Sequence, residues 1–103
     1  MKIPDTRYAR VDGLRLAYQA FGEGPPVLIV PALVSNVELV WEFEGVSRIF
    51  QRLAGHLTVA QFDKRGIGLS DRPEEKPTLE QRIGDIRAIL DELGWESASL
   101  IGM

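Results

Sequence analysis

Apolar and polar residues alternate in the first part of the chain, after a strong turn signal at Asp12-Gly13. This dipeptide favours a two-residue hairpin turn, because both central positions of a type I′ turn need a positive φ. Beyond the turn, every second residue from 14 to 20 is apolar. A period of two predicts a β-hairpin whose second strand, over residues 14–20, has one face in water.

A different strand pattern follows the break of glycine and proline at residues 22–26. Residues 27–30 are apolar at every position and mostly β-branched. A strand that is apolar on both faces is typical of a parallel sheet covered by helices on both sides. We therefore expect a buried strand over residues 27–30, which Pro31 ends.

Two stretches have apolar residues at helical spacing. Within residues 36–54 we expect a short helical turn and then a longer helix, with Gly55 where a C-terminal cap belongs. The best-defined helix covers residues 78–93, because Thr78 and Gln81 match a capping box. Its apolar stripe consists of Leu79, Ile83, Ile86, Ile89, Leu90 and Leu93.

Further strands are expected at residues 57–62 and 98–101, the second of them buried. The order is then hairpin, buried strand, helix, strand, helix, buried strand. Strands that alternate with crossover helices form a parallel sheet. The pattern therefore predicts an α/β fold in which an antiparallel hairpin leads into a parallel sheet with flanking helices. The 103 residues form one domain or part of one.

The composition of the chain argues against several kinds of binding partner and cofactor. A net charge of −3 argues against a nucleic-acid or anionic-membrane surface. The chain has no cysteine and a single histidine, so we expect neither a metal nor a cofactor. Residues 1–15 lack the apolar core of a signal peptide, and the longest apolar run, residues 27–34, is too short to cross a bilayer. A cytoplasmic location is expected.

Glycine-rich segments and the histidine offer little chemistry. Gly22-Glu23-Gly24 precedes a strand, and Asp71 stands where a third glycine should follow Gly66-Ile67-Gly68. We therefore do not expect a dinucleotide or phosphate site. His56 lies between a helix cap and a strand, with no carboxylate or nucleophile near it in sequence, and is expected at the surface.

The loops that follow the two central strands carry the other candidate residues. After the strand at 57–62, a set of charged, glycine and hydroxyl residues is expected to form a structural turn. The set is Asp63, Arg65, Gly66, Gly68 and Ser70. Ser70 has no activating neighbour in sequence. Residues 31–33 lie past the carboxyl end of a buried strand, where parallel sheets bind ligands. From spacing alone, an oxyanion donor and a plain connecting loop are equally good interpretations.

Three segments together resemble the α/β-hydrolase superfamily: PVLIVPALVSN, VAQFDKRGIGLSD and LIGM. More narrowly, VSNVELVWE and FDKRGIGLSDR are similar to bacterial hydrolase-like domains that occur alone or fused to adenylate/guanylate cyclase domains. The resemblance covers the chain from about Tyr8 to Met103. It implies the amino-terminal half of a single α/β-hydrolase domain over residues 1–103, a fold that is incomplete alone.

The resemblance also implies where the catalytic groups lie. In this family the strand after the second helix ends in Gly-x-Ser-x-Gly, a strained turn that exposes the serine. Gly102 and Met103 match its first two positions, so the chain is expected to end just before the nucleophile elbow. The backbone N–H of Leu33 would be one donor of the oxyanion hole. Residues expected to bind the substrate are Leu33, Val34, Asn36 and Trp41.

The leading functional hypothesis is a serine hydrolase, a carboxylesterase that cleaves small esters with a Ser-His-Asp/Glu triad downstream of Met103. The alternatives are a catalytically degenerate module that binds a small ligand, and a non-catalytic fragment that interacts through its sheet edge. A sheet that stops at residue 101 leaves an apolar edge. We therefore expect the chain alone to be inactive, to be unstable or homo-oligomeric, and to need the remainder of its polypeptide.

Overall fold

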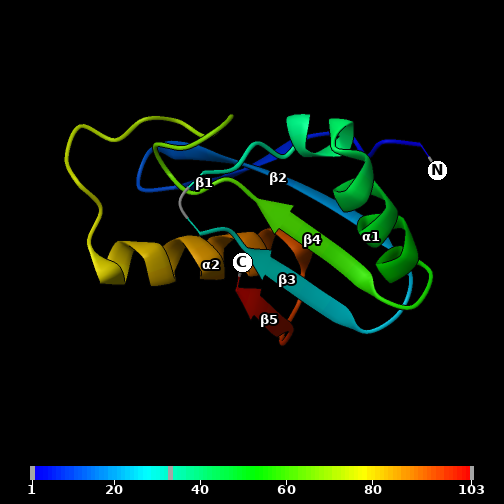
Figure 1. Cartoon of the computed structure of the whole chain (residues 1–103). Helices are drawn as coiled ribbons and strands as arrows, with labels where there is room; N and C mark the ends of the chain where they lie inside the picture. The colour runs from blue at the N-terminus through cyan, green and yellow to red at the C-terminus, as the bar shows by residue number, and fades with distance from the viewer. Residues whose placement is uncertain (1, 33, 103) are drawn as a thin grey trace.

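A mixed sheet forms the centre of the computed structural model, which describes residues 2–32 and 34–102 (Figure 1). Its strands are β1 (Arg7–Val11), β2 (Leu14–Gly22), β3 (Pro26–Val30), β4 (Thr58–Phe62) and β5 (Ser99–Gly102). The helices are the 3-10 helix η1 (Leu39–Glu42), α1 (Glu44–Ala54) and α2 (Leu79–Leu93). Across the sheet the order is β1-β2-β4-β3-β5. None of the helices described here is long and apolar enough to cross a membrane.

The predicted fold class is confirmed. β1 and β2 form an antiparallel hairpin whose turn residues, Asp12 and Gly13, both have positive φ. β2 then pairs antiparallel with β4, and β3 pairs parallel with both β4 and β5. Thr78 and Gln81 form the expected capping box at the start of α2, and Gly94 closes it in the left-handed region. Gly55 follows α1 at the predicted position, with a right-handed φ of −73°.

The prediction that β2 has one face in water is wrong. Ala17 and Gln19, on the face expected to be wet, are both buried. The reason is a long-range network. The Oε1 of Gln19 accepts hydrogen bonds from the indole Nε1 of Trp41, at 2.8 Å, and from Nε2 of Gln61, at 3.1 Å. A polar side chain whose groups are paired in this way can be buried.

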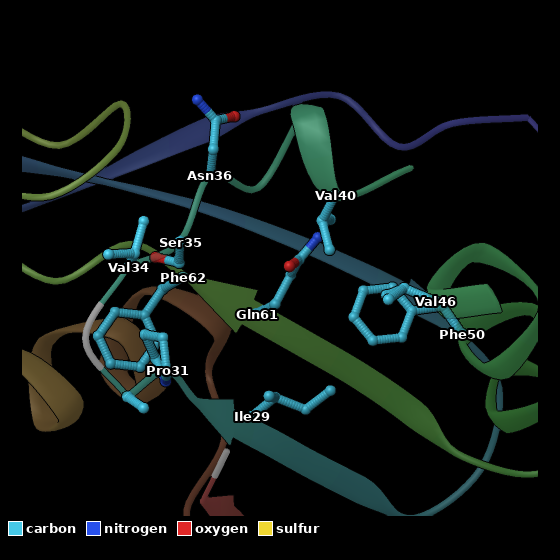
Figure 2. Close-up of a pocket in the computed structure, with 11 residues that line it drawn as sticks. Ile29, Pro31, Val34, Ser35, Asn36, Val40, Val46, Phe50, Gln61 and Phe62 are labelled. Atoms are coloured by element: carbon cyan, nitrogen blue, oxygen red, sulfur yellow. The ribbon is translucent and has the colours of Figure 1, made fainter. Parts of the chain in front are cut away.

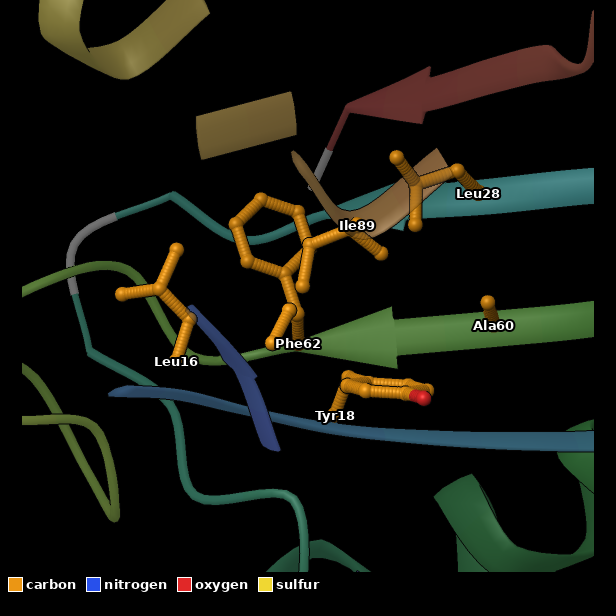
Figure 3. Packing of buried hydrophobic residues seen from close by; sticks show 7 residues of the cluster. Leu16, Tyr18, Leu28, Ala60, Phe62 and Ile89 are labelled. Carbon is orange, nitrogen blue, oxygen red and sulfur yellow. The ribbon is translucent and has the colours of Figure 1, made fainter. Parts of the chain in front are cut away.

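Hydrophobic clusters cover both faces of the sheet. On one face α2 contributes Ile89 to a cluster that Figure 3 shows; its other buried members are Ala9, Leu16, Tyr18, Leu28, Ala60 and Phe62. On the opposite face η1 and α1 add Trp41 and Phe50 to a cluster with Phe21, Ile29 and Val59. The rings of Phe21, Trp41 and Phe50 have centroids 5.1–5.6 Å apart, two of the three pairs edge to face, a geometry that aromatic pairs favour.

β5 is not the buried strand that its apolar sequence predicts. All four of its residues are exposed, Leu100 at 56 % and Ile101 at 41 %. β5 lies at the edge of the sheet and pairs only with β3. The predicted stripe of α2 is likewise uncovered at its start, where Leu79 and Ile83 are exposed. Apolar side chains are therefore exposed both on the edge strand and on the first turns of α2.

Candidate functional site

The connections after β3 and β4 leave the sheet in opposite directions. β3 leads to η1 and α1 on one face, and its neighbour β4 leads to α2 on the other. In open α/β sheets, such a divergence at the carboxyl ends of adjacent strands creates a crevice where ligands bind. The candidate site lies at this point of the fold.

A cavity of about 220 Å³ lies beside the carboxyl ends of β3 and β4, under the loop after β3 (Figure 2). Most of its lining is apolar. The lining residues are Ile29, Pro31, Ala32, Val34, Ser35, Asn36, Val40, Val46, Phe50, Gln61 and Phe62. Two of the three polar side chains among them serve the loop itself. The Oγ of Ser35 donates to Asp63 at 2.5 Å, and the Oδ1 of Asn36 accepts from the N–H groups of residues 38 and 39.

Asp63 connects the loops that follow β3 and β4. Its carboxylate is fully buried and accepts hydrogen bonds from Ser35 Oγ, from the N–H of Val37 at 3.3 Å and from the N–H of Leu69 at 3.0 Å. A buried carboxylate needs such donors, because burial removes its water. One side chain therefore fixes the position of the cavity-lining loop relative to the turn after β4.

Ser70 and the glycines complete this turn. The Oγ of Ser70 accepts from the N–H of Ala17 at 2.9 Å and donates to the carbonyl oxygen of Asp63 at 2.6 Å. The hydroxyl thus joins β2 to the turn, and no general base among the described residues contacts it. Gly66 and Gly68 both have positive φ, at 84° and 55°.

Arg65 joins three parts of the chain. Its guanidinium makes a bidentate contact with Asp85 of α2, at 2.8 and 2.5 Å, and a further contact of 3.0 Å with Asp12 of the hairpin turn. The side chains of Arg65 and Asp85 are 2 % and 3 % exposed. The hydrogen bonds that Arg65 donates to Asp85 raise the pKa of Arg65 above its ordinary value, so the guanidinium is always charged.

A second ion pair, between Arg15 and Asp71, makes stability depend on pH. Hydrogen bonds from the side chain and backbone of Arg15 lower the pKa of Asp71 below its ordinary value of 3.8. A carboxyl with a depressed folded-state pKa stabilises the fold above the unfolded pKa, and this contribution is lost as pH falls through the folded one. We expect Asp71→Asn to lower the free energy of unfolding at pH 7, with the difference from wild type shrinking below about pH 4.

Urea unfolding of both proteins between pH 7 and about pH 3 tests the Asp71 prediction. The matched control is Glu74→Gln, in the same loop, which makes no ion pair among the residues that the structure describes. A destabilisation by Asp71→Asn that stays constant across this range contradicts the prediction.

The structure brings some of the predicted binding residues to the cavity and separates others from it. Val34, which is 88 % exposed, and Asn36 line the cavity. Trp41 does not line it, because its ring is buried in the aromatic cluster. Gly102 ends β5 opposite Val30. Leu33 and Met103 lie outside the described residues.

Gln61, which lines the cavity from β4 and is 7 % exposed, was not predicted from the sequence. The available signal was a single polar residue inside the apolar run of residues 59–62. His56 is exposed, as predicted. Within residues 2–32 and 34–102, no three His, Cys, Asp or Glu side chains are grouped to hold a metal ion.

No protein-family model matches the chain. Among curated proteins, epoxide hydrolase 4 of Mus musculus is 36 % identical over 100 residues, which cover 92 % of this chain and 26 % of that protein. An uncharacterized protein of Mycobacterium tuberculosis is 26 % identical over 99 residues, covering 96 % of this chain and 27 % of the relative. The chain therefore spans about a quarter of the length of these relatives.

Among solved structures, the chain is similar to proteins with an α/β-hydrolase fold. The enol-lactonase of Burkholderia xenovorans matches with a TM-score of 0.78 and 30 % identity, over 94 % of this chain and 36 % of that one. An alpha/beta hydrolase of Sphaerobacter thermophilus has a TM-score of 0.72 and 33 % identity, over 96 % and 35 %. An epoxide hydrolase of Vigna radiata has a TM-score of 0.76 and 25 % identity, over 97 % and 32 %. The chain therefore has part of an α/β-hydrolase fold, and the proteins of named activity that it resembles are hydrolases.

Proposed function

We propose that the chain is the amino-terminal part of an α/β-hydrolase that cleaves carboxylic esters with a Ser-His-Asp/Glu triad from residues beyond Met103. The observation that carries this proposal is the apolar cavity at the carboxyl ends of β3 and β4, within a hydrolase fold. The name of one structural neighbour, an enol-lactonase, states action on a lactone, which is an internal ester. An apolar acyl or alkyl group would occupy the cavity, with the ester carbonyl at its mouth.

The register of β5 supports this arrangement. Gly102 pairs with Val30, so the carboxyl ends of β5 and β3 are adjacent. Neighbouring strands lie about 5 Å apart. A serine on a turn directly after β5 would therefore stand beside the loop after β3. The backbone N–H of Leu33 in that loop would donate to the oxyanion, and one such donor lowers the barrier by about 3 kcal/mol.

The exposed apolar surface of β5 and α2 fits the same proposal. The exposed large apolar side chains of these two elements are Leu79, Ile83, Leu100 and Ile101. We propose that the remainder of the polypeptide covers them. Covering apolar surface stabilises by about 25 cal/mol per Å², and an open apolar strand edge otherwise pairs with other chains.

Epoxide hydrolysis is the second candidate, favoured by the 36 % identity to epoxide hydrolase 4. The two reactions differ in the electrophile. An ester carbonyl develops an oxyanion that backbone N–H groups can hold, whereas an opening epoxide develops an alkoxide on a saturated carbon. The same cavity could hold the apolar substituent of either substrate.

Assays on the complete protein distinguish the two reactions. We expect hydrolysis of p-nitrophenyl butyrate, no conversion of styrene oxide, and a gain of one probe mass after treatment with a serine-directed fluorophosphonate that abolishes turnover. Conversion of styrene oxide without labelling supports the second candidate. The absence of both activities contradicts both candidate functions.

A cavity-filling variant connects the reaction to this site. Val40→Phe is expected to raise the KM for the butyrate ester more than for the acetate ester, because the larger side chain occupies space that the longer acyl group needs. Leu39→Phe is the matched control, since Leu39 is 53 % exposed and does not line the cavity. Equal effects on both esters contradict an acyl group in the cavity.

A further inference from the structure

Gln61 is a polar lining residue of which the loop around the cavity uses only the amide nitrogen. It extends from β4 into the space between Ile29 and Val40, as Figure 2 shows. Its side chain is more than nine-tenths buried. An amide has two donor hydrogens and one acceptor oxygen, and each can take a hydrogen-bond partner.

The orientation of the Gln61 amide is fixed by its nitrogen. Nε2 donates to Gln19 Oε1 and to the carbonyl oxygen of Val37, both at 3.1 Å. Both partners are acceptors, so the nitrogen has to face them. The oxygen therefore faces away from these two acceptors, and Gln61 is one of the residues that line the cavity.

Gln19 cannot release this arrangement by rotating its own amide. Its Oε1 also accepts from Trp41 Nε1 at 2.8 Å, and its Nε2 donates to the carbonyl oxygen of Pro4 at 3.2 Å and to Thr6 Oγ1 at 3.1 Å. If the Gln19 amide were flipped, its NH2 group would face the N–H of Trp41, and its oxygen would face the carbonyl oxygen of Pro4. The network that fixes Gln61 is thus itself fixed from the amino-terminal segment and from η1.

Within residues 2–32 and 34–102, no N–H or O–H group donates to Gln61 Oε1. Ser35 Oγ, also in the lining, donates to Asp63 instead. The carbonyl oxygen of Gln61 is therefore an acceptor without a donor in a residue that lines a mostly apolar cavity.

We propose that the cavity binds an apolar group that carries a hydrogen-bond donor, a hydroxyl or a secondary-amide N–H, which Gln61 Oε1 accepts. The substrate class is then an ester whose acyl or alkyl part bears such a donor a few atoms from the carbonyl. The proposal rests on the proposed hydrolase function only for one step, which is that the bound donor-carrying group is part of the substrate. Binding at Gln61 is independent of turnover, so the two can fail separately.

The test compares two ligands of similar shape, benzyl alcohol and ethylbenzene, whose binding to the complete protein is measured by titration calorimetry. In wild type the hydroxyl meets Gln61, whereas ethylbenzene leaves the amide oxygen unpaired. We expect Gln61→Met to shift the ratio of the two dissociation constants by about tenfold toward ethylbenzene, because a hydrogen bond in a buried site is lost. The variant side chain is of similar length and flexible enough to fill the site.

Val40→Ala is the matched control, since it alters the same lining without touching the acceptor. It is expected to weaken both ligands alike and to leave their ratio unchanged. A ratio that Gln61→Met leaves unchanged overturns the proposal. So does the absence of binding of benzyl alcohol to a protein that hydrolyses esters, which indicates that another segment fills the cavity.

A measurement on the wild-type protein tests the same proposal without requiring that a variant folds. With benzyl alcohol bound, we expect nuclear Overhauser effects between its hydroxymethyl protons and the side chain of Gln61. Ring protons should instead contact Val46 and Phe50, which are apolar residues of the same lining. The reverse orientation, with the ring at Gln61, overturns the assignment of the acceptor.

Discussion

Replacing Gly68 by alanine is expected to lower the free energy of unfolding by about 4 kcal/mol. Gly68 has a φ of 55°, which L residues other than glycine adopt at a cost. A Cβ at this position would also overlap the carboxylate of Asp63 and come within 2.6 Å of the carbonyl oxygen of Ser35. Asp63 is fully buried and holds both loops. The alanine methyl group can be accommodated only if these hydrogen bonds are broken.

Gly84→Ala is the matched control for Gly68→Ala. Gly84 lies within α2, and a Cβ there would meet nothing within 4 Å. Alanine favours helix over glycine by about 1 kcal/mol, so this variant should be more stable than wild type. Urea unfolding monitored by Trp fluorescence measures both. We expect the free energy of unfolding to fall in Gly68→Ala and to rise in Gly84→Ala. A small change in Gly68→Ala would contradict the close approach of Asp63.

Local chemistry made the fold predictable where the determinants lie close together in the sequence. The turn at Asp12-Gly13 requires positive φ at two adjacent residues, and the capping box needs only Thr78 and Gln81. The element order then follows, because helices between apolar strands impose crossovers. None of these inferences depends on a partner distant in sequence.

The errors of sequence analysis arose where distant residues decide burial. Alternation along β2 indicates which side chains are polar, but Gln19 is buried because Trp41 and Gln61 supply its partners. The apolar sequence of β5 favours burial, yet Leu100 and Ile101 are exposed because the strand has a neighbour on one side only. A sequence pattern indicates which side chains are apolar or polar. Whether each one is buried depends on which other elements cover its face of the sheet.

The candidate site was predictable in position and not in detail. The carboxyl end of β3 was identified from a buried strand followed by a loop, and Val34 and Asn36 do line the cavity there. Trp41 was expected beside them, but its indole N–H binds Gln19 in the core. The role of Gln61 depends on two partners, Gln19 of β2 and Val37 in the loop between β3 and η1. Gln19 is in turn held by Trp41 of η1, and a strand pattern contains none of these contacts.

Removal of the buried guanidinium by Arg65→Met is expected to destabilise the protein by about 3–5 kcal/mol, because it leaves Asp85 charged and buried without its partner. The variant also loses the link from the turn after β4 to Asp12 of the hairpin. Arg65→Lys should recover only part of the loss, since an ammonium group cannot make the bidentate contact of a guanidinium. Arg15→Met is the matched control. The Arg15–Asp71 pair is well exposed, so its loss should cost much less.

The double variant Arg65→Met/Asp85→Leu separates the contribution of the pair from the penalty of breaking it. Two apolar side chains in place of two paired charges leave no uncompensated carboxylate. We therefore expect the double variant to be more stable than Arg65→Met alone, and its loss to be smaller than the sum of the two single losses by about 2 kcal/mol. Additive losses would mean that Asp85 reaches water once Arg65 is gone, which its 3 % exposure argues against. The buried pair would then connect the hairpin, the turn and α2 in one relative position without being the main source of their stability.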